Sequence, residues 1–320
     1  MQQQSAGSPS TTSTPARVLV TGANGHIGLR LLRRLASRAG DGIHACAVVR
    51  SQSAAAAVRA AVPAASVEVR IVDYQDVDAL ARAAEACSHV VHLVGILKQT
   101  ALTRYADAHE SAATSLARAA EKAGVRRIVY LSILGADPDS PNPCLASKGR
   151  AERILLERAV PTTVIRLPMV LAPGDPAALA LASRARASFV PLVRGGASFE
   201  QPIDGDDVTT AILLALSRRD LAGVLLELAG PEALPHRELV RRAASLHGRR
   251  PRIFPLPYSL VAVAAALFER VLANPPLTRA MLDVLEHDDR IEPGPACRRL
   301  GLVLTPLDDT LRRCAGPEAS

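Results

Sequence analysis

Three glycines at three-residue spacing, Gly22, Gly25 and Gly28, follow the apolar run Val18–Val20 and precede a helical pattern. Glycine lets the backbone turn sharply and approach an anion closely, and a helix N-terminus offers unpaired N–H groups and a positive dipole charge. A strand, a glycine turn and a helix at this spacing therefore predict a seat for a pyrophosphate. The alternative is a tight strand-to-helix turn that binds nothing.

Arg50 is a second candidate binding residue, because it directly follows the predicted second strand, Ile43–Val49. An acidic residue here, about 20 residues beyond the glycines, would bond the ribose hydroxyls of NAD. A guanidinium instead matches a 2′-phosphate. We therefore expect NADP(H) to be favoured over NAD(H), unless Arg50 is simply a solvent-exposed side chain.

Further candidates follow the next two predicted strands, Val67–Val72 and His89–Val94. Asp73 and Tyr74 come directly after the first of these strands. Gly95 ends the second, where it lets the backbone run close beside a ligand. Asp73 is either a nucleotide ligand or a turn residue that caps the following helix.

Apolar strand patterns and amphipathic helix patterns alternate from Val18 to Leu167. Parallel strands that are covered on both faces appear as continuous apolar runs. The alternation therefore implies an α/β fold with a doubly wound parallel sheet, a Rossmann fold. We expect a disordered tail over 1–15, an NAD(P)-binding domain over 16–170, and over 171–320 the remaining Rossmann elements with a smaller, mostly helical capping region.

The glycine turn, read from Thr21 to Gly28, resembles the Thr-Gly-x-x-Gly-x-x-Gly turn of the extended and atypical short-chain dehydrogenase/reductases. The resemblance implies a nicotinamide dinucleotide cofactor, with Asp73 at the adenine amino group. In that superfamily a tyrosine four residues before a lysine transfers the proton, and the lysine also holds the ribose. A hydroxyl after the fifth strand polarises the substrate carbonyl. Lys148 and Ser132 match these positions.

Cys144 stands at the tyrosine position, and this departs from the superfamily pattern. A cysteine side chain is too short to deliver a proton to the same point. Ile133 and Leu134 also occupy positions where a polarising hydroxyl is often found. We therefore interpret Lys148, Ser132 and Cys144 as the catalytic positions, with Cys144 a non-catalytic small apolar residue.

The glycine turn, the strand ends and the resemblance together give a set of predicted cofactor-binding residues. They are Gly22, Asn24, Gly25, His26, Ile27, Gly28, Arg50, Asp73, Tyr74, Leu93, Val94, Gly95, Lys148, Leu167 and Val170.

Other segments resemble a narrower family, the nucleotide-binding accessory subunit of respiratory complex I and its bacterial relatives. The segments most telling of this subgroup are Gly230-Pro231-Glu232 and Pro276-Leu277-Thr278. The resemblance implies tight NADPH binding with little or no turnover. The replacement of tyrosine by Cys144 supports the same interpretation.

Composition limits the partners that we expect. The net charge of +7 suits an anionic lipid face or an acidic protein, but aromatic residues make up only 2% of the chain. Single-stranded nucleic acid is bound on aromatic platforms, so we expect no nucleic-acid partner. The five cysteines show no metal-ligand spacing and favour reduced thiols and no metal site.

The most apolar stretch is Leu256–Leu272, and its apolar core, Leu260–Phe268, is shorter than the about 20 residues that span a bilayer. We expect a helix there, either packed on the small domain or docked on a membrane or a membrane complex.

We expect the protein to be an NADP(H)-binding, oxidoreductase-related protein that is linked to quinone or respiratory metabolism. One alternative is an active reductase or epimerase on a small carbonyl or sugar-like substrate. Another is a nucleotide-sensing scaffold with a membrane-associated protein partner. The expected location is cytoplasmic, and peripheral at the inner membrane face if such a partner exists.

Overall fold

The computed structural model describes residues 17–38, 40, 43–63 and 66–316. The predicted tail, residues 1–15, lies outside these residues. Seven parallel strands form the main sheet in the order β11-β6-β5-β4-β1-β2-β3. Their bounds are β1 Arg17–Thr21, β2 His44–Val49, β3 Val67–Ile71, β4 His89–His92, β5 Arg127–Ile133, β6 Thr162–Leu167 and β11 Leu225–Glu227.

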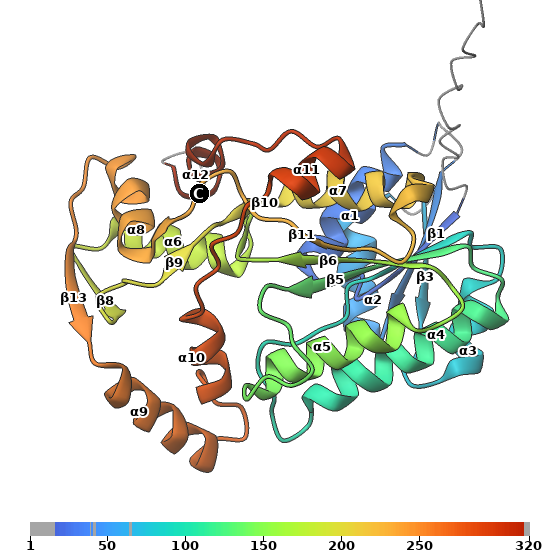
Figure 1. Ribbon diagram of the computed structural model, residues 1–320, viewed down its shortest axis with the longest axis horizontal. Coiled ribbons are helices and arrows are strands. Elements are labelled where there is room, and N and C mark those ends of the chain that lie inside the picture. The colour runs from blue at the N-terminus through green and yellow to red at the C-terminus, as the bar shows by residue number, and fades with distance from the viewer. Residues whose placement is uncertain (1–16, 39, 41–42, 64–65, 317–320) are drawn as a thin grey trace, which may run out of the picture.

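The central strands of this sheet are largely apolar and buried, because helices cover both faces (Figure 1). One face packs on α1 (His26–Ala36), α2 (Gln52–Ala61), α7 (Gly205–Ser217) and α11 (Gly294–Leu300). The other packs on α3 (Val77–Ala84), α4 (Ala112–Lys122) and α5 (Pro143–Leu156). The structure thus confirms the predicted doubly wound Rossmann fold.

The order of the strands reverses at β1, which pairs with β2 on one side and β4 on the other. Crossover helices leave a crevice at such a reversal, outside the carboxyl ends of the strands, and ligands of doubly wound sheets bind there. The glycine turn follows β1, Arg50 follows β2 and Gly95 lies beyond β4. The topology therefore brings three separately predicted segments to one edge of the sheet.

The C-terminal part forms a second apolar core around α6 (Pro176–Arg186), α8 (His236–Ser245) and α12 (Leu307–Ala315). Three two-stranded sheets accompany these helices. They pair β7 (Val170–Leu171) with β10 (Ile203–Asp204), β9 (Phe199–Glu200) with β12 (Leu234–Pro235), and β8 (Phe189–Val193) with β13 (Arg252–Leu256). The predicted helical C-terminal region is confirmed, and the small sheets add to it.

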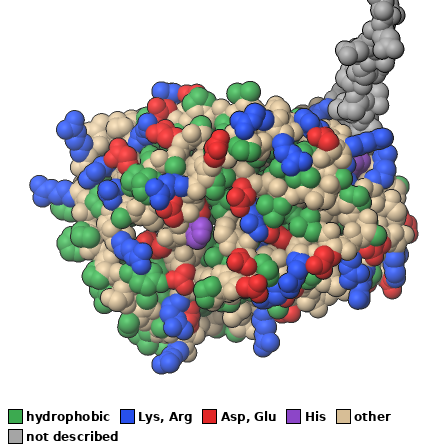
Figure 2. Space-filling view, in the orientation of Figure 1, with side chains coloured by type: hydrophobic (Ala, Val, Ile, Leu, Met, Phe, Trp, Pro, Cys, Tyr) green, Lys and Arg blue, Asp and Glu red, His purple; other side chains and the backbone are tan. Residues whose placement is uncertain are grey.

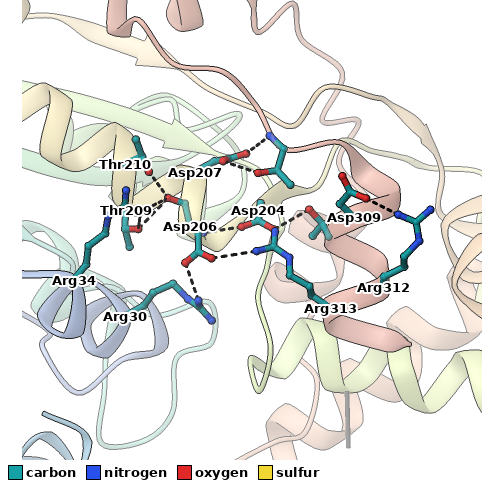
Figure 3. A network of polar contacts seen from close by, with 12 residues as sticks. Arg30, Arg34, Asp204, Asp206, Asp207, Thr209, Thr210, Asp309, Arg312 and Arg313 are labelled. Atoms are coloured by element: carbon teal, nitrogen blue, oxygen red, sulfur yellow. Dashed lines mark hydrogen bonds and ion pairs between the residues drawn. The ribbon is translucent and has the colours of Figure 1, made fainter. Parts of the chain in front are cut away.

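A network of charged and hydroxyl side chains joins α12 and α7 to α1 (Figure 3). One carboxylate oxygen of Asp206 lies 2.9 Å from Nη1 of Arg30 in α1, and the other lies 3.2 Å from Nη1 of Arg313 in α12. Asp204 caps α7, contacts Arg313 and accepts a hydrogen bond of 2.8 Å from Thr310. These contacts fix the C-terminal helix against the helix that follows the glycine turn.

Two helices differ from what the sequence predicts. The helical pattern from Tyr105 to Gly124 predicts one long helix, but the structure has a π-helical stretch, Ala106–Ser111, before α4. The pattern from Ser147 to Ala159 predicts the next helix. In the structure α5 begins four residues earlier, at Pro143, because Asn142 caps it by accepting hydrogen bonds from two backbone N–H groups. Cys144 therefore lies in the first turn of α5.

The apolar stretch near the C-terminus forms α9 (Tyr258–Val271), followed by the short helix α10 (Arg279–Leu285). The helix α9 contacts α10 through its small side chains, with Ala265 its buried residue, and its large apolar side chains are exposed. Among the described residues, no helix has the length and apolarity needed to cross a membrane.

Candidate functional site

The glycine turn leaves no room for side chains at two of its three glycines. Gly22 has a φ of +68°, and a Cβ there would lie 2.9 Å from the carbonyl carbon of Leu93. A Cβ on Gly28 would lie 2.7 Å from the carbonyl oxygens of both Gly22 and Ala23. Gly25 is the N-cap of α1 and has no side-chain cap. The first amides of α1 are thus left without a side-chain partner at the turn.

A cleft of about 660 Å³ opens beside this turn. Its volume lies in the range of small-molecule sites, roughly 300–1,000 Å³. Nine of the predicted cofactor residues line the cleft, together with two that the sequence did not point to. The lining consists of Gly22, Asn24, Gly25, Arg50, Asp73, Tyr74, Leu93, Val94 and Gly95, with Ser51 and Ala54 in addition.

Tyr74 connects the glycine turn to the second strand. Its hydroxyl accepts a hydrogen bond of 2.8 Å from the Gly22 N–H and donates one of 2.9 Å to the Val48 carbonyl. Burial raises the pKa of this phenol, so it stays protonated and keeps both bonds. Tyr74 thus holds the turn in place, a role that its position after β3 did not indicate.

Arg50 lines the cleft, with its guanidinium carbon 5.7 Å from the centre of the Tyr74 ring. Among the described residues no carboxylate forms an ion pair with it. The neighbouring Ser51 caps α2 by accepting a hydrogen bond of 3.2 Å from Ala54 N–H. Asp73 is exposed and accepts a bond of 3.0 Å from Gln75 N–H, so it serves as a turn residue while it also lines the cleft.

The remaining predicted cofactor residues do not line this cleft. The His26 ring lies 3.2 Å from the Asp175 carboxylate. Ile27 and Leu167 pack in the core between the sheet and α1, and Gly28 is buried in the turn. Val170 lies half-buried in β7.

Cys144 is fully buried, with its sulfur 3.7 Å from the carbonyl oxygen of Ile96. Burial raises the pKa of this thiol to about 11. Tyr105 approaches it from the N-terminal end of the π-helical stretch, and its phenol donates a hydrogen bond of 2.8 Å to the Leu97 carbonyl. A buried, protonated thiol is a poor nucleophile at neutral pH.

Lys148 is buried, and its ammonium points toward the sheet. It donates hydrogen bonds of 3.1 Å to the Tyr130 hydroxyl and to the Leu131 carbonyl. Burial lowers its pKa to about 8. A Cβ on Gly95 would lie 2.9 Å from Nζ, so the ammonium lies directly beneath a residue that lines the cleft.

The surroundings of Lys148 contain three buried polar atoms without a hydrogen-bond partner among the described residues. They are Ser132 Oγ, His92 Nε2 and His109 Nδ1. Burial lowers the pKa of both imidazoles to about 3, so both rings are neutral. His92 stacks on Tyr130 and bonds Thr21, while His109 accepts a bond from Ile96 N–H.

Sequence reasoning missed several residues here because they come from distant segments. Tyr130 and His109 carry no motif. His287, on the loop after α10, lies over Gly135, where an added Cβ would come within 2.7 Å of its Nε2. Asp289 holds the other ring nitrogen at 3.1 Å, and this hydrogen bond raises the pKa of His287.

The turn, the cleft and the unpaired guanidinium fit a dinucleotide. The Gly22–Gly28 cradle suits a pyrophosphate, and Arg50, Asp73 and Gly95 line the cleft that continues from it. The cofactor, when bound, supplies or accepts a hydride. The described residues include no cluster of side chains suited to hold a metal ion.

The fold and the cleft define a class, the Rossmann proteins that bind a nicotinamide dinucleotide. The family described as NAD(P)H-binding matches residues 22–187 of this chain. The chain belongs to this NAD(P)H-binding family.

Relatives with established names extend the match beyond these residues. A ceramide reductase from Caulobacter vibrioides is 30% identical over 264 residues, 80% of this chain and 79% of the relative. Subunit 9 of the NADH dehydrogenase (ubiquinone) 1 alpha subcomplex from Arabidopsis thaliana is 28% identical over 200 residues, 61% of this chain. The match spans 49% of that plant protein's length.

Solved structures share the fold at lower identity. The UDP-glucuronic acid 4-epimerase from Bacillus cereus, in complex with UDP-glucuronic acid and NAD, superposes with a TM-score of 0.73. It is 15% identical, and the match covers 93% of this chain and 98% of the epimerase. This chain is therefore an NAD(P)-binding protein that shares its fold with such epimerases, with homology to the ceramide reductase and the predicted homology to the complex I subunit.

Proposed function

We propose that this protein binds NADP(H) in preference to NAD(H) and retains it with little or no turnover through the usual tyrosine route. The observation that carries the proposal is the contrast within one site. The glycine cradle opens on a cleft that the unpaired Arg50 lines, whereas Cys144 is a buried, protonated thiol. In this proposal Lys148 orders the nicotinamide ribose, and no tyrosine stands at position 144 for it to assist.

Calorimetric titration with NADPH and NADH tests the cofactor preference. We expect NADPH to bind at least about tenfold more tightly, because a guanidinium bonds a 2′-phosphate that NADH lacks. Tighter binding of NADH would contradict the preference. Reduction of quinones or small ketones by the NADPH-loaded wild-type protein, at the rate of a working reductase, would contradict the low turnover.

A second candidate function is a working reductase on a carbonyl compound with an apolar chain. The relative named ceramide reductase favours it, as does Lys148 at its motif position. His287, paired with Asp289, then lies over the Gly135 turn after β5. Turnover of a long-chain ketone that His287→Gln abolishes and Cys144→Ala leaves unchanged would favour this candidate.

We further propose that the protein is cytoplasmic and works at the inner membrane face, near a quinone-like substrate or a membrane-associated protein partner. The support is the exposed apolar helix α9, together with the likeness to a subunit of a ubiquinone-linked dehydrogenase. Recovery of the protein with washed membranes at low salt, and not in their absence, is the expected result. A protein that never sediments with membranes would contradict it.

A further inference from the structure

The helix α9 carries its large apolar side chains on the outside. Leu260, Val263, Leu267 and Val271 are 61%, 68%, 58% and 71% exposed, and we refer to these four residues as the α9 stripe. The buried residue of the helix is Ala265. On an ordinary surface helix the large apolar side chains face the core and the polar ones face water.

The four residues of the α9 stripe lie on one side of the helix. Their spacings of three, four and four residues place them within an arc of about 80°, at about 100° per residue. Single exposed apolar residues are common on protein surfaces, but a contiguous apolar patch marks an interaction site. The pattern therefore indicates that the α9 stripe is covered by an apolar surface outside this chain.

The two-stranded sheet that precedes α9 also exposes large apolar side chains. Phe189 of β8 and Phe254 of β13 are 66% and 63% exposed. Arg252 pairs with Phe189 in the register, and Phe254 lies two residues further along β13, so all three share one face of the sheet. β13 ends two residues before α9 begins, and both lie along one margin of the molecule (Figure 1).

Arginines border the same surface. Arg249, Arg250 and Arg252 line a pocket of about 230 Å³ together with Phe189, and Arg270 lies on α9 itself. None of these four arginines forms an ion pair with a carboxylate in the part of the chain that the structure describes. Glu269 on α9 is already bound to Arg279. Figure 2 shows apolar and basic side chains together along this lower margin.

We propose that the α9 stripe and the outer face of β8 and β13 dock on the surface of an anionic lipid bilayer. The stripe enters the interface between headgroups and acyl chains, and the arginines bond the lipid phosphates, as in interfacial amphipathic helices. With 14 residues, α9 is shorter than the about 20 residues that cross a bilayer, so it lies in the surface plane.

Charge complementarity favours a bilayer over a second copy of this chain. Pairing two copies through the stripe would bring two sets of unpaired arginines together, in a protein of net charge +7. An anionic membrane satisfies the arginines and the apolar side chains at once. The inference deepens the membrane-peripheral location proposed above, and it does not depend on nucleotide binding.

Flotation with vesicles of phosphatidylglycerol and phosphatidylcholine in equal parts tests the proposal. We expect the wild-type protein to float with these vesicles and at least about tenfold less with pure phosphatidylcholine, because each arginine near an anionic surface adds to binding. The double variant Val263→Asp/Leu267→Asp should lose flotation. Arg249→Gln/Arg250→Gln should weaken it and reduce its salt dependence.

The matched control is Val303→Asp, because Val303 is 88% exposed and lies in the loop before α12, outside the surface. It should float like the wild type, and all variants should keep the wild-type NADPH affinity. Absence of flotation on anionic vesicles, or flotation that survives the α9 changes, would overturn the proposal. So would a lipid-free dimer that the α9 changes dissociate, since a second copy would then cover the stripe.

Discussion

At the scale of single residues, Arg50 is the side chain on which cofactor choice depends. It lines the cleft and lies over Tyr74, and no carboxylate among the described residues neutralises it. Arg50→Gln should weaken NADPH binding about tenfold or more, or about 1.4 kcal/mol, and leave NADH binding nearly unchanged. Calorimetry with both cofactors measures this. The control is Arg59→Gln on the exposed side of α2, and equal losses for both cofactors would contradict the assignment.

Lys148 makes a prediction about pH. Burial lowers its pKa to about 8, so between that value and the ordinary lysine pKa the unfolded chain holds a proton that the folded chain does not. The contribution of Lys148 to the free energy of unfolding must therefore rise as the pH rises through that window. Between about pH 8 and about pH 10, the free energy of unfolding of the wild type should rise by up to about 1.4 kcal/mol per pH unit relative to that of Lys148→Met.

Urea unfolding of both proteins across this pH range measures the difference. Comparison with Lys148→Met removes the contributions of tyrosines and other groups that titrate in the same window. Curves that run parallel would show that Lys148 has an ordinary pKa in the folded protein.

At the scale of elements, the contact between α7 and α12 depends on Asp204. This carboxylate caps α7 and accepts the buried hydrogen bond from Thr310. Asp204→Ala should lower the free energy of unfolding by about 2 kcal/mol, the sum of a lost cap and an unpaired buried hydroxyl. Asp309→Ala, which breaks only an exposed pair with Arg312, should cost no more than about 0.5 kcal/mol. Equal losses in urea unfolding would contradict this ranking.

The sequence predicted the elements that periodicity and glycine encode. Apolar runs such as Val18–Val20 locate strands because both sheet faces are covered, and the glycine spacing locates the turn because side chains are excluded there. The sequence indicated the helix α9, but it could not indicate whether the large side chains of this helix are buried or exposed. An apolar segment has the same composition whether its large side chains are buried or exposed, and only tertiary packing decides which of them meet water.

At the scale of the whole molecule, the site combines residues that periodicity could predict with contacts that only folding creates. Strand order brings Gly22, Arg50 and Gly95 to one cleft, and the parallel topology made that predictable. The contact between Tyr105 and Cys144, and the position of His287 over Gly135, join segments far apart in the chain. No local pattern specifies such contacts.

The central claim is that the backbone from Gly22 to Gly28 holds the diphosphate of NADPH. Hydrogen–deuterium exchange, measured by mass spectrometry with and without saturating NADPH, tests it on the unmodified protein. We predict that NADPH slows exchange in the peptides that contain 22–29 and 93–96 and leaves α9 unchanged. Tight NADPH binding without protection of the 22–29 segment, or no binding at all, would contradict the account.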